Sequence, residues 1–383
     1  MATREDRLAK LLSPAGVEIN GNQPWDPQLH DKTAYDKILG GGTLGIGDAY
    51  VDGLWDSDEL DELISRVLGA DLHRSIAMSP QLIASTAMAR IVNMQSRRRS
   101  KEVATAHYDL PSELYESFLD PNMQYTCGYW READDLNEAQ RNKMDLIARK
   151  LGITAGMKVL DIGFGWGQLA NYFAQEHGAE VTGITISETQ HRYAKEHFDS
   201  PDYKLMDYRE LDMPEHFDRV TAIGVIEHVG YKNYRPFMQT VRNLLNQDGM
   251  FLLQTIGNTK TTVTGDAWLS RYIFPNGMTP SEVQLATAAE GVLLKEDGHS
   301  FGSDYDKTLM AWFDNFNANW PGLEGRMIDE SRPELGHYDE HFYRTWKYYL
   351  LMCAGSFRSR KAMQLWQNVY SKNGIRGGYE SVR

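Results

Sequence analysis

KVLDIGFGWG (Lys158–Gly167) decides the fold of this chain. Its apolar half is typical of a buried strand, and its glycine-rich half is typical of a turn that opens a helix. Such a turn leaves backbone N–H groups free and lets a cofactor approach the main chain closely. Asp161 stands at the end of the strand, whereas the acid of a dinucleotide fingerprint follows the glycines by about 20 residues. A glycine turn can also be simple packing, so the segments that follow must decide between the two interpretations.

Strands and helices alternate after this loop. A second apolar run over 180–185 precedes a polar helix over 188–198, which Ser187 is placed to cap. Further strands are predicted over 203–206, 219–226 and 250–256, with a helix over 234–245 and a turn over 247–249. This alternation predicts an α/β fold with a doubly wound parallel sheet. Ligands bind beyond the carboxyl ends of such strands, and the residues at or near those ends are Gly163, Thr185, Asp207, Glu227 and Gln254.

Length and composition limit the remaining possibilities. A chain of 383 residues predicts one large domain with a smaller one, and 42% hydrophobic residues are ordinary for a globular core. The two cysteines give no disulfide framework and suit a reducing cytoplasm. Residues 1–12 mix charged with apolar residues, which is not typical of a signal peptide. The longest apolar runs fall far short of the ~20 residues that a membrane helix needs.

The charge pattern indicates possible partners. A net charge of −13 argues against general binding to nucleic acid, whose phosphates would be repelled. Two basic clusters are present, one of them Arg97, Arg98, Arg99 and Lys101 with Arg90 upstream, the other Arg358, Arg360 and Lys361. Each can meet anionic lipid headgroups, at about 1 kcal/mol per close cation. Each can equally be a solvated surface or a linker.

The chain divides into three parts by pattern. Residues 1–95 form short helical and turn-rich pieces, with glycine-rich turns near 40–42 and 45–50 and amphipathic helices over 58–67 and 80–95. Residues 96–106 form a basic linker, and the second domain spans 107–383. Its first helices are predicted over 112–119 and 136–151. The aromatic loop 123–130 between them either folds over a ligand or packs on the following helix.

The C-terminal part is rich in aromatic residues. Leu309, Trp312, Phe313 and Phe316 recur at helical spacing. Such a stripe is most often core, and it can also line a channel for an acyl chain.

Motifs along nearly the whole chain carry a resemblance to one family. The chain resembles the cyclopropane-fatty-acyl-phospholipid synthases and their relatives that modify mycolic acids, and its glycine loop resembles that of class I S-adenosylmethionine-dependent methyltransferases. The matching motifs are 45–55, 58–60, 107–109, 124–130, the glycine loop, 185–187, 207–209, 226–230, 255–257, 272–277, 304–306, 309–312 and 353–358.

The resemblance implies a fold and a reaction. The fold would be a mostly parallel, Rossmann-like methyltransferase sheet with a small, mainly helical N-terminal domain for lipid or membrane engagement. The reaction would transfer the methyl group of S-adenosylmethionine to the cis double bond of an unsaturated acyl chain in a membrane phospholipid, with loss of a proton to close a cyclopropane ring. The enzyme would be a cytoplasmic homodimer bound peripherally to the inner face of the membrane, with the phospholipid bilayer as its partner.

The chemistry explains which residue types the site needs. An alkene has no ionisable proton, so positioning against the methyl group in a dry pocket must do most of the work. Positive charge then develops on carbon, and aromatic faces such as that of Tyr305 can stabilise it. A base is needed only after methyl transfer.

In the family that base is thought to be a bound bicarbonate. Glu227 follows an apolar strand, where it can hold a proton and donate it to the anion, although it can also simply cap the next turn. His228 is interpreted as structural. The residues that the resemblance assigns to bicarbonate are Cys127, Glu227, Gln254, Ile256 and Tyr305.

The resemblance also assigns the cofactor site and indicates no metal. Thr185 stands where many methyltransferases have a ribose-binding acid, Gln190 could supply the missing hydrogen bonds, and Asp207 could accept from the adenine amino group or be a simple strand-end acid. The residues assigned to S-adenosylmethionine are Tyr125, Thr126, Gly163, Gly165, Thr185, Gln190, Asp207 and Tyr208.

The chain departs from the family pattern at two positions. Gln254 stands where relatives commonly have His, and Gln can donate to bicarbonate but cannot carry a proton. Phe164 replaces a common Cys and should not decide cofactor binding. Cys353 matches a family motif, and we interpret it as a structural thiol because methyl transfer to an alkene needs no covalent enzyme intermediate.

Other functions stay open at this stage. The catalytic domain also resembles that of plant N-methyltransferases of small amines, although the N-terminal match favours lipid. The product can be a methyl branch instead of a ring. A lipid-binding protein that retains the fold without turnover is a third alternative, against which the intact glycine loop and Glu227 stand.

Overall fold

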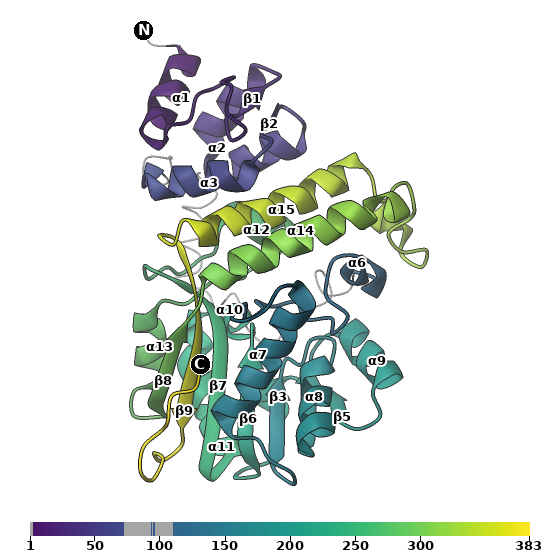
Figure 1. Cartoon of the computed structure of the whole chain (residues 1–383), viewed down its shortest axis with the longest axis vertical. Helices are drawn as coiled ribbons and strands as arrows, with labels where there is room; N and C mark the ends of the chain where they lie inside the picture. The colour runs from purple at the N-terminus through teal and green to yellow at the C-terminus, as the bar shows by residue number, and fades with distance from the viewer. Residues whose placement is uncertain (1–2, 73–92, 94, 96–109) are drawn as a thin grey trace. The chain divides into compact units, whose positions relative to one another are not determined.

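The computed structural model describes residues 3–72, 93, 95 and 110–383 (Figure 1). Contacts divide the chain into two compact units. Unit 1 comprises Met1–Val92, Val263–Gly277 and Tyr305–Met363, and unit 2 comprises Asn93–Thr262, Met278–Asp304 and Gln364–Arg383. Two later segments thus join the N-terminal part, which the sequence pattern did not indicate. The predicted helix over 80–95, the basic cluster at 97–101 and the linker 96–106 lie outside the described residues, apart from Asn93 and Gln95.

Unit 2 is built on a seven-stranded sheet with the order β5-β4-β3-β6-β7-β9-β8. Neighbours from β5 to β7 pair in parallel, whereas β8 and β9 are antiparallel. The predicted α/β fold with a mostly parallel sheet is therefore confirmed. The strands are β3 (Lys158–Ile162), β4 (Glu180–Thr185), β5 (Asp202–Leu205), β6 (Phe217–Ile223), β7 (Leu245–Asn258), β8 (Leu294–Ser300) and β9 (Met363–Ser371).

Two apolar layers cover the sheet, because successive strand residues point to opposite faces. Leu160 joins a core cluster with residues of α11 (Tyr234–Leu244) and α13 (Glu282–Ala289). Its neighbour Val159 joins a second cluster with residues of α7 (Leu136–Leu151) and α8 (Gln168–His177). Figure 1 shows α7 running across the sheet. The central strands are thus buried on both faces, and their carboxyl ends are left for the site.

Most predicted elements of unit 2 match the structure. The helix α7 has the predicted bounds, and α9 (Glu188–His197) begins where Ser187 accepts a hydrogen bond from the Gln190 N–H. The helix α6 (Ser112–Glu116) is shorter than the predicted 112–119. Residues 247–249 were predicted as a turn and are instead part of β7, where a register shift interrupts its pairing with β6.

The end of β6 corrects one prediction that matters for the site. The strand was expected to reach residue 226, but it ends at Ile223 because Gly224, with φ 69°, turns the chain. Ile226–Val229 then form the short helix α10. Glu227 therefore lies on a helical turn beyond the sheet instead of directly after the last residue of a strand.

Unit 1 is mainly helical. Its two short strands pair with each other in an antiparallel ladder. The elements are α1 (Arg4–Leu12), η1 (Ser13–Ala15), β1 (Gln28–Leu29), α2 (Thr33–Val51), β2 (Trp55–Asp56), α3 (Leu60–Gly69), α12 (Ala267–Tyr272), α14 (Ser303–Leu323), η5 (Pro333–Leu335) and α15 (Glu340–Arg358).

The glycine-rich runs of unit 1 were predicted as turns, and this prediction is wrong. Both lie in α2, which is broken only at Gly42 (φ 60°, ψ −148°). Packing explains Gly47 in the second run: a Cβ there would lie 2.3 Å from Cδ1 of Trp268. Trp268 in turn packs on Tyr348, with ring centroids 4.6 Å apart. The second run therefore serves close helix packing, whereas the first run contains the kink at Gly42.

The aromatic stripe of α14 is core, as one of its two interpretations predicted. Leu309, Trp312 and Phe316 are buried, and Phe316 packs against aromatic rings of α15. A channel for an acyl chain along this stripe stays a prediction.

Candidate functional site

The glycine loop between β3 and α8 is held in a conformation that only glycine adopts easily. Gly163, Gly165 and Gly167 have φ values of 71°, 59° and 97°. A Cβ on Gly163 would lie 2.6 Å from Cγ2 of Val225, whereas a Cβ on Gly165 would meet no protein atom within 4 Å. Phe164 turns inward, where its ring packs on Tyr203 with centroids 4.8 Å apart. The loop therefore presents open backbone at Gly165 and core packing at its other positions.

The segment with Tyr125, Thr126 and Cys127 is fastened to α7. The Gln140 side-chain amide donates to the Thr126 carbonyl at 2.8 Å, and the Lys143 ammonium donates to the Thr126 hydroxyl at 2.8 Å. A Cβ on Gly224 would lie 3.2 Å from Cγ2 of Thr126, so this segment reaches the end of β6. Two predicted cofactor residues are thus brought to the carboxyl edge of the sheet.

Thr185 and Gln190 are brought together at the end of β4. The Thr185 hydroxyl donates to the Gln190 side-chain oxygen at 3.1 Å and accepts from the Ser187 N–H at 3.2 Å. Both side chains are buried. This contact agrees with the idea that Gln190 complements Thr185, while their role toward a ribose stays a prediction.

Asp207 already has strong partners. Its two carboxylate oxygens accept from Nε and Nη2 of Arg209 at 2.8 and 2.6 Å, and it is only 3% exposed. The adjacent Tyr208 packs edge-on against Phe237, and burial raises the pKa of its hydroxyl to about 12. An adenine amino group would therefore share the Asp207 carboxylate with a bidentate arginine.

Glu227 is a buried carboxyl group at this edge with a strongly raised pKa. It is 6% exposed, its Oε1 accepts from the Ile256 N–H at 2.7 Å, and its Oε2 is buried without a hydrogen-bond partner. Burial raises its pKa to about 7, against the lowering effect of the backbone hydrogen bonds. The carboxyl group can therefore hold a proton near neutral pH and donate it from Oε2. This unsatisfied atom fits an oxyanion such as bicarbonate.

Gln254 lies on β7 two residues before Ile256, in register with Ile223 of β6. Its side-chain oxygen accepts from the Gln367 amide at 2.8 Å, and both residues are buried. The amide oxygen is thereby occupied, which leaves the NH₂ group of Gln254 as the donor toward the site.

The other members of the predicted bicarbonate set lie in different places. Ile256 contacts Glu227 through its N–H, and Cys127 is buried with its thiol 3.2 Å from the Gly128 carbonyl. Tyr305 belongs to unit 1, where its ring packs against Phe357 with centroids 4.5 Å apart. Unit 2 therefore holds four of the five predicted residues, and its own contacts join Glu227 to Ile256.

Two further groups match their structural interpretation. Burial lowers the pKa of His228 to about 4, so this imidazole is neutral at physiological pH. Burial also raises the pKa of the Cys353 thiol, which disfavours the reactive thiolate.

Sequence reasoning missed three polar residues that support the site. Gln140 and Lys143 lie on the buried face of α7, and Gln367 lies in the middle of β9. Gln140 and Lys143 occupy the same helical stripe as Leu136 and Ile147, at spacings of three and four residues. Polar residues in an apolar stripe are a signal that could have identified the first two. The pairing of Gln367 with Gln254 depends on the strand order and had no such signal.

Comparison with known proteins agrees with this geometry. The family model of mycolic acid cyclopropane synthetase matches residues 95–368. The cyclopropane-fatty-acyl-phospholipid synthase of Escherichia coli K12 is 43% identical over 376 residues, 98% of this chain and 94% of that protein.

Solved structures confirm the class I methyltransferase fold. The mycolic acid cyclopropane synthase CmaA1, in complex with SAH and CTAB, is 28% identical with a TM-score of 0.62 over 71% of this chain and 98% of that one. Coclaurine N-methyltransferase is 20% identical with a TM-score of 0.67 over 85% of this chain and 98% of that one, a likeness in fold alone. The chain therefore belongs to the mycolic acid cyclopropane synthetase family and is an S-adenosylmethionine-dependent methyltransferase.

Proposed function

We propose that this protein methylates the cis double bond of unsaturated acyl chains in membrane phospholipids and closes a cyclopropane ring, with bound bicarbonate as the proton acceptor. The buried Glu227 carboxyl, with its raised pKa and its unsatisfied Oε2, carries this proposal. The near full-length similarity to the cyclopropane-fatty-acyl-phospholipid synthase supports the substrate class.

The cofactor residues have separate tasks in this proposal. S-adenosylmethionine supplies an electrophilic methyl group when it is bound. Gly165 leaves room for it beside the backbone, while Thr126, Thr185 and Asp207 present polar groups at the strand ends. The glycine loop and the fastened segment around Thr126 fix these groups before binding, which lowers the entropic cost of alignment.

The remaining residues are proposed to bind the group that accepts the proton released at ring closure. Bicarbonate would supply the base that the reaction needs after methyl transfer. Protonated Glu227 donates from Oε2, the Ile256 region fixes the carboxyl, and Gln254 donates from the amide that Gln367 orients. The neutral His228 supplies no charge here. Tyr305 is proposed to present an aromatic face to the developing positive charge.

Methyl transfer to lipid tests this proposal. The purified full-length protein is expected to move labelled methyl from S-adenosylmethionine into vesicles of cis-unsaturated phospholipid and not into matched saturated vesicles. Scintillation counting of the extracted lipid measures the transfer. Binding of the cofactor without any label in the unsaturated lipid would contradict the proposal and favour a lipid-binding role.

Bicarbonate dependence is a separate prediction at Gln254. After rigorous depletion, turnover of the parent protein is expected to rise with added bicarbonate until it saturates. Gln254→His should be tolerated, because the ring can accept from Gln367 and donate to the anion. Gln367→Leu frees the Gln254 amide and should raise the bicarbonate concentration needed for half-maximal rate by roughly tenfold, the cost of about one charge-assisted hydrogen bond. No bicarbonate response in any of the three proteins would mean that another group removes the proton.

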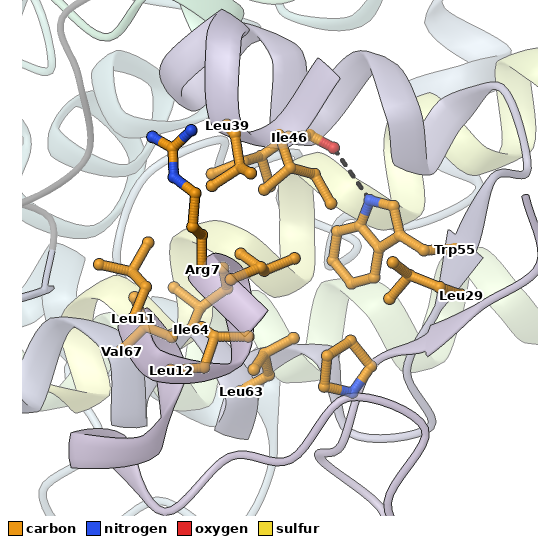
Figure 2. A pocket seen from close by; sticks show the side chains of 13 residues that line it. Arg7, Leu11, Leu12, Leu29, Leu39, Ile46, Trp55, Leu63, Ile64 and Val67 are labelled. Atoms are coloured by element: carbon orange, nitrogen blue, oxygen red, sulfur yellow. Dashed lines mark hydrogen bonds between the residues drawn. The ribbon is translucent and has the colours of Figure 1, made fainter. Parts of the chain in front are cut away.

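We also propose that residues 1–95 engage the membrane and support a homodimer at the inner face of the membrane. Among the described residues, no helix is both long and apolar enough to span a bilayer. Residues of α1, α2 and α3, with neighbouring loop and strand residues, enclose an apolar cavity of about 250 Å³ (Figure 2). Its lining residues are Arg7, Leu8, Leu11, Leu12, Pro27, Leu29, Ile38, Leu39, Ile46, Trp55, Leu63, Ile64 and Val67.

The cavity suits an acyl chain of a phospholipid. Its lining is mostly apolar, and in Figure 2 the guanidinium of Arg7 points away from Leu11, Leu12 and Leu63. Arg7 is exposed and can meet an anionic headgroup while apolar groups fill the cavity. This arrangement supports membrane engagement by unit 1 from its own residues.

A charge in this cavity is expected to weaken vesicle binding. Leu12→Glu and Leu39→Glu should each lower the affinity for anionic phospholipid vesicles by roughly tenfold or more, the value of burying one leucine side chain. Cofactor affinity should not change. Leu294→Glu is the matched control, because Leu294 is 53% exposed on β8. Vesicle flotation measures the binding, and equal binding of the cavity variants and the control would contradict the proposal.

A methyl-branched product is the second candidate function within the same site. The proposed acceptor is the same double bond, and loss of a different proton would leave a methyl-branched alkene of the same mass instead of a ring. Methylation of a small amine has weaker support, since the likeness to coclaurine N-methyltransferase concerns the fold alone.

A further inference from the structure

Lys143 on α7 is a buried cation that makes no direct ion pair among the described residues. The side chain is 0% exposed, and its ammonium makes one hydrogen bond, to the Thr126 hydroxyl at 2.8 Å. No carboxylate of the described residues lies within the 4.0 Å that defines an ion pair. A charge in such a position is costly unless an anion joins it.

Two carboxyl groups act on Lys143 without pairing with it directly. The carboxylate oxygens of Asp120 accept from the backbone N–H groups of Asn122 and Gln124. Oδ1 of Asp161 accepts from the Thr221 hydroxyl at 2.8 Å, and its Oδ2 is buried without a hydrogen-bond partner. Burial lowers the pKa of Lys143 to about 8, while Asp120, Cys127 and Asp161 oppose this shift. The ammonium therefore keeps its proton at neutral pH without a direct counter-ion.

Thr126 is placed to connect this charge with a ligand. Its hydroxyl oxygen accepts from Lys143, so its own proton is available to a further acceptor. Thr126 belongs to the segment that we assign to S-adenosylmethionine, which carries a sulfonium, an ammonium and one carboxylate. The carboxylate is the only group of this cofactor that a buried cation attracts.

We propose that Lys143 is a positioning residue that orients the Thr126 hydroxyl and gives the cofactor site its preference for the α-carboxylate of S-adenosylmethionine. The proposal rests on the cofactor site proposed above and adds a residue that no sequence motif indicated. The alternative is that Lys143 only clamps the segment to α7, as Gln140 does through the Thr126 carbonyl.

S-adenosylmethionine and its decarboxylated analogue distinguish a role in carboxylate recognition from a purely structural role of Lys143. Decarboxylated S-adenosylmethionine keeps the sulfonium and the amine but lacks the carboxylate. In the full-length protein, Lys143→Met is expected to weaken binding of S-adenosylmethionine by roughly tenfold to a hundredfold, the range for a hydrogen bond to a charged group. It should leave the affinity for the decarboxylated ligand within about twofold. Isothermal titration calorimetry measures both affinities.

Companion variants make the test specific. Lys143→Gln keeps a donor without the charge and should recover part of the lost affinity. Thr126→Val should reproduce the loss, and the double variant should add little to it, because both residues act on the same carboxylate. Lys150→Met is the matched control: Lys150 is the other buried lysine of α7, and its ammonium lies near His299 and Asp297. It should not alter the preference between the ligands.

The thermal stability of the ligand-free protein is a second readout. Replacing an uncompensated buried charge by a methionine should leave the melting temperature unchanged or raise it. Equal losses for both ligands, or a lower melting temperature with unchanged ligand preference, would mean a structural clamp and overturn the proposal. If the parent protein binds neither ligand, the cofactor assignment fails together with this proposal.

Discussion

Glu227→Gln is expected to lower turnover about a hundredfold, because the loss of one preorganised donor of this kind typically costs ~3 kcal/mol. The carboxyl is buried with Oε1 on the Ile256 N–H and with Oε2 unsatisfied. Glutamine keeps the shape and can place a neutral NH₂ donor at the position of Oε2, but it cannot present an acidic proton, so the expected loss is that of the acidic O–H donor. Affinity for S-adenosylmethionine should stay nearly unchanged, so single-turnover assays and calorimetry together identify the step that is lost. A variant with normal turnover would remove Glu227 from the mechanism.

The same substitution should change the pH dependence of stability. The folded pKa of Glu227 is about 7, above its ordinary value of 4.5. The folded state therefore binds more protons between these two pH values, and stability is lost as pH rises through this window. Glu227→Gln removes this contribution, so its melting temperature at pH 8 should equal or exceed that of the parent protein. A lower melting temperature would indicate that the loss of turnover reflects unfolding.

Gly165→Ala is expected to weaken binding of S-adenosylmethionine by about a hundredfold, or roughly 2.7 kcal/mol. The backbone at Gly165 has φ 59°, and a Cβ there would project into space that no protein atom fills within 4 Å. We assign that space to the cofactor, which a methyl group would exclude. Calorimetric titration measures the change.

The chain offers a matched control for backbone strain. Gly152, at the end of α7, has φ 56° and also no atom within 4 Å of a Cβ. Gly152→Ala should therefore show the same cost in unfolding stability, about 1–2 kcal/mol for a left-handed residue, without a change in cofactor affinity. Equal cofactor affinity in the two variants would place the cofactor away from the loop.

The sheet was predictable because its signals are local. The strand at Lys158–Ile162 and the helices α7 and α9 follow from apolar runs and cap residues that stand next to each other in sequence. The resemblance to a family then placed Glu227 and Gln254 near the same edge, and the register of β6 with β7 brings their strands side by side.

The features that sequence reasoning missed depend on tertiary contacts. Glycines normally break helices, yet the run at 45–50 in α2 stays helical, and its Gly47 packs against Trp268, far along the chain. The Lys143 contact with Thr126 joins a helix to a loop, and the Gln367 contact with Gln254 joins two strands more than a hundred residues apart. No local sequence pattern indicates the pairing of Gln367 with Gln254.

Mass spectrometry of the lipid product tests the central claim most directly. Vesicles of cis-unsaturated phospholipid, incubated with the purified protein and S-adenosylmethionine, should gain the mass of one CH₂ group per modified chain. The product should resist reagents that attack a double bond, as a cyclopropane does. An unchanged lipid mass, with the cofactor bound and the protein folded, would contradict methyl transfer to phospholipid, and a product of the same mass that still reacts as an alkene would contradict ring closure.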